Sequence, residues 1–510
     1  MFPMTTDTTP RARAREWFGL AVLVLPTLLL SLDLSVLYLA IPHISMDLKP
    51  SSSQTLWILD VYGFMIAGFL ITMGTLGDRI GRRKLLLTGA TVFGITSVIA
   101  AYSVNAEMLV ATRAFLGIAG ATIMPSTLAL ISNMFKHSGQ RSMAIALWMS
   151  CFLVGTAIGP VVGGLLLESF WWGSVFLLGV PVMALLLVTA PFLLPEYRDP
   201  EAGTLDLYSV PLSLATILPM IYGLKEIAKD GFQLLPSTSI LVSLLVGILF
   251  LRRQNKLKHP LMDLSLFNNR RFNTALSLML FSGFILSGMI LYTTQYLQMV
   301  EGMTPMYAGF WLLPSSGAMI AASMLAPVLS QKMKAGPVLI LFLAIAMAGC
   351  LLLIFVEPDS MVLLITGMVL VGIGSSPIGV ICTDLVVGSA PPEKAGSASS
   401  LSETSAEFGI ALGVAVLGSI GTTVYRNMIA DNVPPSVPAD SSIAIKDTLA
   451  NALVTINQLP EDIAGDLLVS AQEAFTQGFS ASAMISALLL AVLSALSWRM
   501  FRDVTPSPRD

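Results

Sequence analysis

The sequence predicts an all-α polytopic membrane protein with fourteen transmembrane helices. Of its 510 residues, 55% are hydrophobic and only 12% are charged, whereas soluble domains carry roughly 25% charged residues. Fourteen apolar runs approach the roughly 20 residues that a helix needs to cross a bilayer. The net charge of −3 gives no reason to expect a nucleic-acid partner.

The apolar runs divide into two sets of six around a central pair. The first six lie near residues 17–41, 56–77, 85–103, 107–132, 143–166 and 174–194, the pair near 207–224 and 236–252, and the last six near 272–298, 305–330, 336–355, 361–387, 398–424 and 477–498. We therefore predict a cytoplasmic N-terminus (1–16), a six-helix bundle (17–200), two inserted helices (201–260), a second six-helix bundle (261–500) and a cytoplasmic tail (501–510). Within the second bundle, residues 425–476 form an extracellular loop in which 447–459 and 467–475 could be short amphipathic helices.

The distribution of positive charges supports an even number of spans. Cytoplasmic loops of membrane proteins are enriched in Lys and Arg. If the chain starts inside and crosses fourteen times, 22 of the 28 Lys and Arg residues fall inside and Arg113 lies within a helix. The other five fall outside: Lys49, Lys225, Lys229, Arg426 and Lys446. Both termini are therefore expected in the cytoplasm.

The connection between the second and third helices reads GTLGDRIGRRKLL at 74–86. Its glycines permit a tight turn and close packing of helix ends. Asp78 can accept charge-assisted hydrogen bonds from an arginine or from helix N-terminal amides. Arg82, Arg83 and Lys84 can anchor the loop at an anionic inner surface. A basic loop that only sets orientation is the alternative interpretation.

The fourth and fifth helices contain residues that need an explanation in a membrane. Arg113, in LVATRAFLGIAGA, costs about 2.5–3.5 kcal/mol at depth on insertion scales, so it needs a partner or contact with water. The fifth helix contains GTAIGPVVGG, in which a GxxxG pair favours close packing and a proline bends the helix. These residues are Gly155, Gly159, Pro160, Gly163 and Gly164.

Acidic side chains lie inside four of the predicted helices. Asp33 lies deep in the first, Asp60 near the outer end of the second, and Asp384 near the inner end of the twelfth. In LSETSAEFGI, Glu403 and Glu407 are one turn apart and only ~40° apart around the helix. Carboxylic acids at such depth can carry protons or attract a cation. For the two glutamates, the alternative is that they form structural hydrogen bonds. For Asp60, the alternative is a solvated position. For Asp384 we expect a structural or gating role.

Three of these patterns resemble motifs of the major facilitator superfamily. G-x-L-x-D-R-x-G-R-R-K matches its loop between helices 2 and 3, R-x-x-x-G-x-x-G-A its helix 4 motif, and G-x-x-x-G-P-x-x-G-G the helix 5 motif of its antiporters. LSLDLSVLYLAIP, LWILDVYGF, MPSTLALISNMF and LSETSAEFGI, together with the inserted helices, are similar to the fourteen-helix drug:proton antiporters. The likeness covers essentially the whole chain and includes efflux pumps for quaternary ammonium antiseptics and dyes.

The resemblance implies a fold of two six-helix bundles plus two extra helices, and roles for particular residues. Proton coupling is implied for Asp33, Arg113, Glu403 and Glu407, and cation recognition for Asp33, Asp60, Glu403 and Glu407. A latch and gating role is implied for Asp78, Arg79, Arg82, Arg83, the helix 5 glycines and Pro160. An amphipathic cation also needs an apolar, aromatic cavity. Candidate lining residues are Trp57, Tyr62, Phe64, Trp148, Tyr292, Gln295, Tyr296 and Trp311, although most membrane aromatics serve packing.

The predicted protein is a monomeric, proton-coupled multidrug efflux antiporter of the bacterial inner membrane, and not an enzyme. It uses the proton gradient and needs no cofactor or metal, since the chain has no G-x-x-x-x-G-K-[ST] loop for ATP. A symporter or exporter of another metabolite or of a lipid on the same fold is the alternative. A membrane-embedded enzyme is disfavoured because His43, His137 and His259 are scattered over separate loops.

Overall fold

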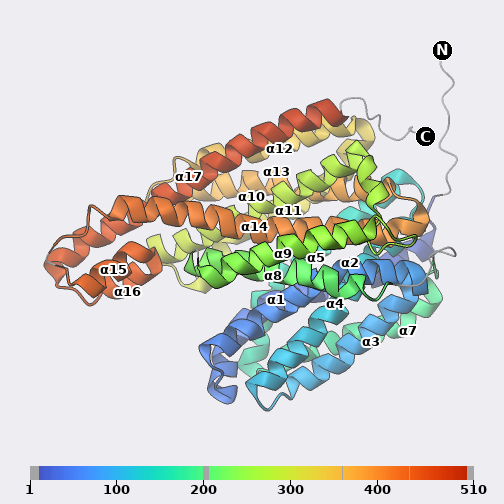
Figure 1. Cartoon of the computed structure of the whole chain (residues 1–510), viewed down its shortest axis with the longest axis horizontal. Helices are drawn as coiled ribbons and strands as arrows, with labels where there is room; N and C mark the ends of the chain where they lie inside the picture. Colours follow the sequence, from blue (N-terminus) through green and yellow to red (C-terminus); the bar gives the residue numbers. More distant parts are fainter. Residues whose placement is uncertain (1–10, 199–205, 232, 359, 436, 502–510) are drawn as a thin grey trace.

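The computed structural model describes residues 11–198, 206–231, 233–358, 360–435 and 437–501. Within these ranges every regular element is helical, and the long helices run beside one another as a bundle (Figure 1). Fourteen segments are long and apolar enough to cross a membrane, which confirms the predicted fold class. The predicted N-terminal segment 1–16 and tail 501–510 lie mostly outside the described residues.

The helices follow the predicted order of six spans, an inserted pair and six spans. The first six spans are α1 (Ala14–Leu48), α2 (Ser52–Ile80), α3 (Arg82–Ala101), α4 (Ala106–Met134), α5 (Ser138–Ser169) and the broken helix α6 (Ser174–Leu177) and α7 (Gly179–Leu193). The inserted pair is α8 (Ser209–Asp230) and α9 (Leu234–Gln254). The last six spans are α10 (Arg270–Gln295), α11 (Pro305–Lys332), α12 (Ala335–Leu353), α13 (Met361–Gly388), α14 (Ala395–Ile429) and α17 (Glu461–Phe501). Short helical segments complete the chain: η1 (Leu264–Asn268), η2 (Tyr296–Val300), η3 (Pro392–Lys394), α15 (Ala439–Asp447) and α16 (Leu449–Ile456).

Buried apolar side chains form two large cores, one for each set of six spans. The first core is built mainly by α1 to α7, and the second mainly by α10 to α17. The two halves meet where α2 packs against α14 and where α5 packs against α11. Side chains on α2, α5, α11 and α14 are therefore placed at the interface between the halves.

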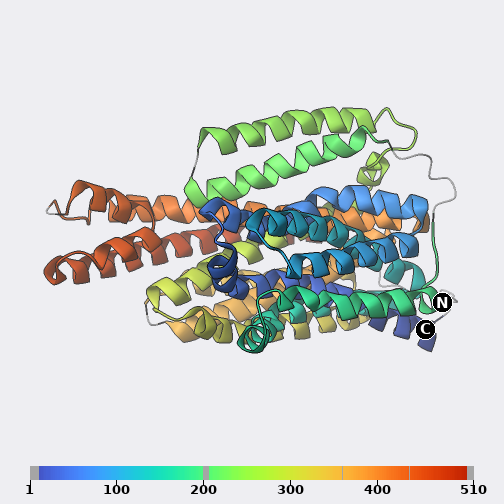
Figure 2. The same cartoon turned by 90° about the horizontal axis from the view of Figure 1, so that it is seen from below.

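The inserted pair lies on one flank of the bundle (Figure 2). α8 packs against both α2 and α14, so it borders both halves, and α9 packs on α8. Asp206, before α8, accepts hydrogen bonds from Arg253 at 2.7 and 2.9 Å and from Ser209 at 2.6 Å. The bonds from Arg253 in particular hold the pKa of Asp206 well below its ordinary value. This carboxylate therefore stays charged at neutral pH and ties the two helices together.

The region predicted as loop 425–476 is largely helical. α14 continues to Ile429, and α17 already begins at Glu461. The predicted helix at 447–459 corresponds to α16, whereas 467–475 is part of the last membrane-spanning helix rather than a separate surface helix. The span prediction stopped short because this extension is amphipathic: Leu467, Ala471 and Ala474 are buried at helical spacing among polar neighbours.

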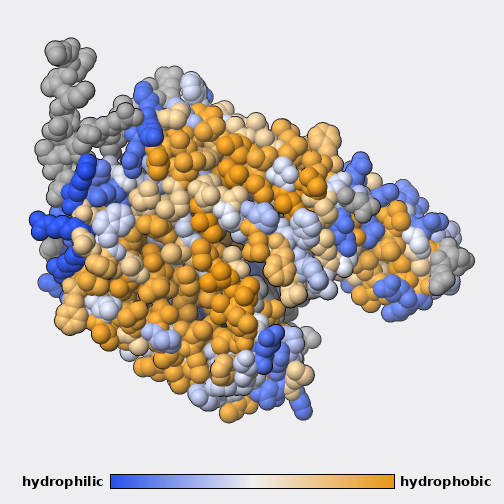
Figure 3. All heavy atoms as spheres, turned by 180° about the vertical axis from the view of Figure 1, so that it is seen from behind, coloured by the Kyte–Doolittle hydropathy of each residue, from blue (hydrophilic) through white to orange (hydrophobic). Residues whose placement is uncertain are grey.

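The two ends of the bundle differ in chemistry from its middle. Figure 3 shows hydrophobic residues covering the middle of one face and hydrophilic residues gathered at both ends, as a bilayer requires. We call the end with the α2–α3, α4–α5 and α13–α14 connections the basic end, because it carries Arg82, Arg141 and Lys394. We call the opposite end, from which α15 and α16 project (Figure 1), the far end.

Close packing between α1 and α5 depends on the glycines of α5. A side chain at Gly155 would meet the carbonyl oxygen of Leu28 and the hydroxyl of Ser31, and one at Gly159 would meet Ser35. Gly164, in contrast, has open space around it. Pro160 lies within α5, but its side chain is outside the described set.

We expect Gly155→Ala to destabilise the protein by about 1–3 kcal/mol, because overpacking displaces the α1 backbone. Gly164→Ala should be neutral or slightly stabilising, since alanine favours the helix by roughly 1 kcal/mol. Thermal unfolding of the purified variants in detergent measures both. Equal melting temperatures for the two variants would show that α1 and α5 do not pack in this way.

Candidate functional site

Asp33 and Arg113 form a buried ion pair between α1 and α4. Arg113 donates from Nη1 to Asp33 Oδ2 at 2.5 Å and from Nε to the Ile58 carbonyl at 3.2 Å. Arg113 is fully buried, whereas 11% of the Asp33 side chain remains exposed. A guanidinium cannot lose its charge, and a lone buried charge is costly. Asp33 therefore supplies the partner that an arginine at this depth requires.

Two buried hydrogen-bond donors at this ion pair have no partner among the described residues. The Arg113 guanidinium lies over the Tyr62 ring, 4.4 Å from its centre. Arg113 Nη2 and the Tyr62 hydroxyl are both buried and have no hydrogen-bond partner among the described residues. Buried polar groups are nearly always paired. These donors can therefore accommodate a water molecule or a polar group that enters during function.

Glu403 and Glu407 lie on the side of α14 that faces away from α10. Ser405, on the opposite side, donates to the Leu276 carbonyl of α10 at 2.9 Å, and each glutamate is about 160° from Ser405 at 100° per residue. Both glutamates are partly buried. Neither forms a hydrogen bond or an ion pair with another described residue. The two carboxylates are therefore available to a proton or a cation.

The glutamates and the Asp33–Arg113 pair belong to one electrostatic cluster. The Tyr62 hydroxyl is within electrostatic range of Asp33, Arg113 and Glu407, and Glu403 is within range of Glu407. Two carboxylates one helical turn apart can share their protons as a unit. We call Asp33, Arg113, Tyr62, Glu403 and Glu407 the central cluster. It combines side chains of α1, α2 and α4 with those of α14, one helix of the second half.

Asp60 lies outside this cluster, in an ion pair with the inserted helix α8. Lys225 Nζ is 2.6 Å from Asp60 Oδ1 and 4.7 Å from the centre of the Phe64 ring. Trp57 packs edge-on against Phe64, with ring centres 5.9 Å apart. From the sequence, a solvated position was an alternative for Asp60, and Lys225 contributed only to the charge distribution, because no sequence pattern indicates which helix an inserted pair will contact.

The remaining aromatic candidates have varied surroundings. Trp148, Tyr292 and Tyr296 are buried in the two cores. Trp148 donates to a threonine hydroxyl of α4 at 3.1 Å, and the two tyrosine hydroxyls donate to backbone carbonyls at 2.8 and 2.6 Å. Gln295 is partly buried and Trp311 is exposed. In this conformation the first three residues serve packing, and contact of all five with a cargo stays a prediction.

Asp78 ties the α2–α3 connection to the start of α14. Its carboxylate accepts hydrogen bonds from Arg82 at 2.8 and 2.9 Å, and from the backbone N–H groups of Gly396 and Ser397 at 3.1 and 2.9 Å. Arg79 and Arg83 contact connecting segments instead: Arg79 donates to a carbonyl of the α9–α10 connection and Arg83 to a carbonyl at the end of α7. Asp78 and Arg82 thus join the two halves at the basic end.

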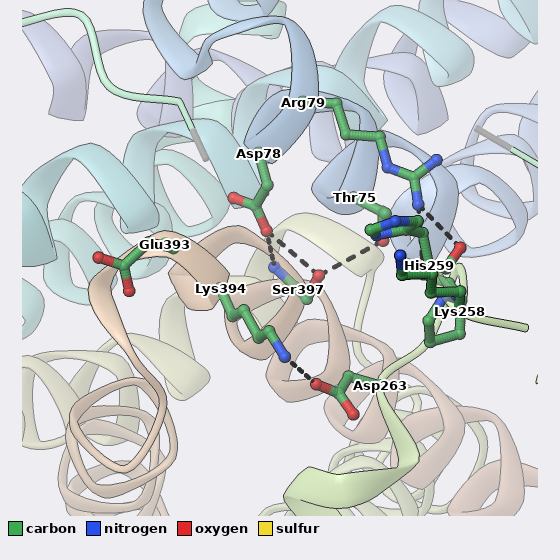
Figure 4. A pocket seen from close by; sticks show the side chains of 10 residues that line it. Thr75, Asp78, Arg79, Lys258, His259, Asp263, Glu393, Lys394 and Ser397 are labelled. Carbon is green, nitrogen blue, oxygen red and sulfur yellow. Dashed lines mark hydrogen bonds and ion pairs between the residues drawn. The ribbon is translucent and has the colours of Figure 1, made fainter. Parts of the chain in front are cut away.

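A polar pocket opens beside Asp78 (Figure 4). Its lining comes from α2, the α9–α10 connection and the α13–α14 connection: Thr75, Asp78, Arg79, Lys258, His259, Pro260, Asp263, Glu393, Lys394 and Ser397. Lys394 and Asp263 form an ion pair across it. Burial acts to raise the pKa of Asp263, but hydrogen bonds from Lys394 and Ser265 outweigh it and hold that pKa below its ordinary value. The ionic contact therefore persists at neutral pH.

Asp384 forms a second contact between the halves at the basic end. Arg141 of α5 donates from Nε to Asp384 Oδ1 at 2.6 Å, and the Ser142 hydroxyl donates to Oδ2 at 2.5 Å. Asp384 was predicted from the sequence, whereas its partners Arg141 and Ser142 were not. The position of Arg141 at the start of a span could have indicated an ionic partner for Asp384, but arginines at such positions also set the orientation of a membrane protein. Asp78 and Asp384 together link the two halves at the basic end.

We expect Asp78→Asn to open the basic end more often, because it removes the charge that binds Arg82 and the α14 amides. A cysteine at Ser400, a buried position packed on Gly74, would report this in a background without the native cysteines. Its labelling by a membrane-impermeant maleimide should be severalfold faster in the Asp78→Asn variant. Asp440→Asn, at an exposed acid of α15, is the matched control. Unchanged labelling would contradict a latch at Asp78.

The described residues contain no group of three or more His, Cys, Asp or Glu side chains arranged to hold a metal ion. Within the central cluster, Asp33 is paired with Arg113. What the arrangement can do chemically is to bind and release protons and to attract a cation.

Comparison with known proteins agrees with this architecture. The family model "Major Facilitator Superfamily" matches residues 23–414. The multidrug efflux pump LfrA of Mycolicibacterium smegmatis is 39% identical over 498 residues, covering 98% of each chain. The methyl viologen resistance protein SmvA of Salmonella typhimurium is 31% identical over 487 residues, covering 95% of this chain and 98% of SmvA.

A solved structure supports the fold independently. The crystal structure of the human organic anion transporter MFSD10 (TETRAN) superposes with a TM-score of 0.60, at 16% identity, covering 94% of this chain and all of the MFSD10 chain. At that identity the likeness concerns the fold alone. With the family match and the two relatives above, the conclusion is that this chain belongs to the major facilitator superfamily, as a transporter of its fourteen-span drug efflux family.

Proposed function

We propose that this transporter is a proton-coupled antiporter that exports lipophilic and quaternary ammonium cations. The observation that carries the proposal is the central cluster, in which Glu403 and Glu407 form no direct ion pair with a described residue while Asp33 is paired with Arg113. A carboxylate in an apolar site attracts a cation only while it is deprotonated. Cation and proton therefore compete for the same group, which is the requirement for exchange.

Two conformations turn this competition into export. On the side with the higher pH the carboxylates lose their protons and bind the cation. On the other side protonation releases the cation, and the protonated cluster returns. The two halves would rock about the cluster to expose it alternately. The contacts of Asp78 and Asp384 close the basic end, so these contacts must break for the cluster to be reached from there.

The proposed orientation places the basic end and both termini in the cytoplasm of a bacterial cell, with α15 and α16 outside. The positive-inside rule supports it, as do the bacterial sources of LfrA and SmvA. In this orientation the contacts of Asp78 and Asp384 lie at the cytoplasmic end. We propose that the protein acts as a monomer, since one chain supplies all residues of the cluster.

Transport by the purified protein in proteoliposomes tests this proposal. An imposed pH gradient should drive ethidium movement against the proton flow, and a protonophore should collapse it. A metabolite or lipid transporter would move no ethidium under the same gradient. If the rate of ethidium movement does not depend on the pH gradient, proton coupling is ruled out.

A further inference from the structure

Lys225 places a positive charge where a cationic cargo would be expected to bind. Its ammonium group is 2.6 Å from the Asp60 carboxylate and 4.7 Å from the centre of the Phe64 ring, and Trp57 flanks that ring. A carboxylate beside aromatic faces is the chemistry that recognises organic ammonium ions. Trp57, Asp60 and Phe64 lie at helical spacing on one side of α2. The lysine therefore fills what is otherwise a cation subsite.

The ion pair is not needed to hold α8 in place. The side chains of Lys225 and Asp60 are 39% and 35% exposed, so the pair is only partly buried. α8 is held by apolar contacts instead: Leu224 packs with Ala411 and Ala415 of α14. Gly68 of α2 also packs closely on leucines of α8. The ammonium group can therefore leave Asp60 without detaching its helix.

Lys225 also acts on the central cluster. Its helix α8 packs against both α2 and α14, and Lys225 is within electrostatic reach of Glu407. One positive charge thus reduces the attraction that both Asp60 and Glu407 exert on an incoming cation. The effect of such a charge on a bound ion scales with the charge of that ion.

We propose that Lys225 is a resident cation that occupies the Trp57–Asp60–Phe64 subsite in the empty transporter and sets its selectivity against dications. A cargo cation displaces the ammonium group from Asp60. The repulsion that remains is twice as large for a dication as for a monocation in the same position. The proposal rests on the proposed cation transport and adds a specificity-determining residue from the inserted helix pair.

The experiment compares the dissociation constants of ethidium, a monocation, and methyl viologen, a dication, for the purified protein in detergent. Lys225→Gln should bind ethidium about threefold and methyl viologen about tenfold more tightly, since the logarithm of the second change is about twice that of the first. Lys225→Arg keeps the charge and should bind both as the wild type does. Lys446→Gln removes a lysine from α15 and is the matched control.

The outcomes separate this inference from the proposed function. If the wild-type protein binds neither cation, the proposed function and the inference both fail. If it binds both, and Lys225→Gln leaves both constants unchanged or shifts them equally, the inference fails while the proposed function stands. An equal effect of Lys225→Arg and Lys225→Gln would likewise overturn it, because the charge would then not be the cause.

Discussion

Replacing Asp33 with asparagine is expected to abolish proton-driven export and to destabilise the protein. Asp33 is the ionic partner of the fully buried Arg113. Breaking a buried pair by removing one charge typically costs about 3–5 kcal/mol, because the other charge remains buried without compensation. The stability loss is measured by thermal unfolding in detergent. The transport loss is measured as ethidium movement under a pH gradient in proteoliposomes.

A double variant separates the two effects. Asp33→Asn combined with Arg113→Gln removes both charges, so it should recover most of the lost stability. It should still fail to transport, because one of the carboxyl groups of the central cluster is absent. If the double variant is stable and exports ethidium at the wild-type rate, Asp33 has a structural role only.

Replacing Glu407 with glutamine should weaken cation binding strongly while leaving the fold intact. Glu407 has no hydrogen bond or ion pair with a described residue, so its charge holds no structural partner. A unit charge about 4 Å away at an effective dielectric constant of roughly 20 contributes about 4 kcal/mol. After the cost of desolvation, we expect ethidium to bind on the order of 10- to 1000-fold more weakly. Binding to the purified protein measures the change.

Two further glutamate variants complete this test. Glu403→Gln changes the same chemical group one turn away and shows which member of the pair the cation contacts. Glu473→Gln, at an exposed position of α17, is the matched control and should bind as the wild type does. A Glu407→Gln protein with wild-type affinity would remove Glu407 from the proposed site.

The fold could be predicted from composition and periodicity because the bilayer restricts the alternatives. Twenty apolar residues at a stretch have few options other than a spanning helix, and fourteen were found in the right order. The prediction was incomplete where polar residues entered a helix. The extension of α17 around Leu467 and Ala471 is stabilised by packing on one side only. Its polar side interrupts the apolar run, so the extension was not recognised as part of a spanning helix.

Individual residues of the candidate site could be selected from the sequence, but their partners could not. A charge inside an apolar run is unusual by itself, which was sufficient to select Asp33, Arg113 and Glu407. Which charges meet depends on how the helices pack. Arg113 is paired with Asp33 of α1, and Asp60, which is partly exposed, is paired with Lys225 of the inserted helices. The spacing of residues along the chain does not indicate which helices will contact one another.

In the proposed function, cation and proton compete for the carboxylates of the central cluster. Proton release can be measured when ethidium is added to the purified protein in a weakly buffered solution. The wild-type protein should release protons on binding, and the Glu407→Gln variant should release fewer at equal occupancy. Saturable ethidium binding without proton release, at every pH at which the protein remains folded, would contradict the claim.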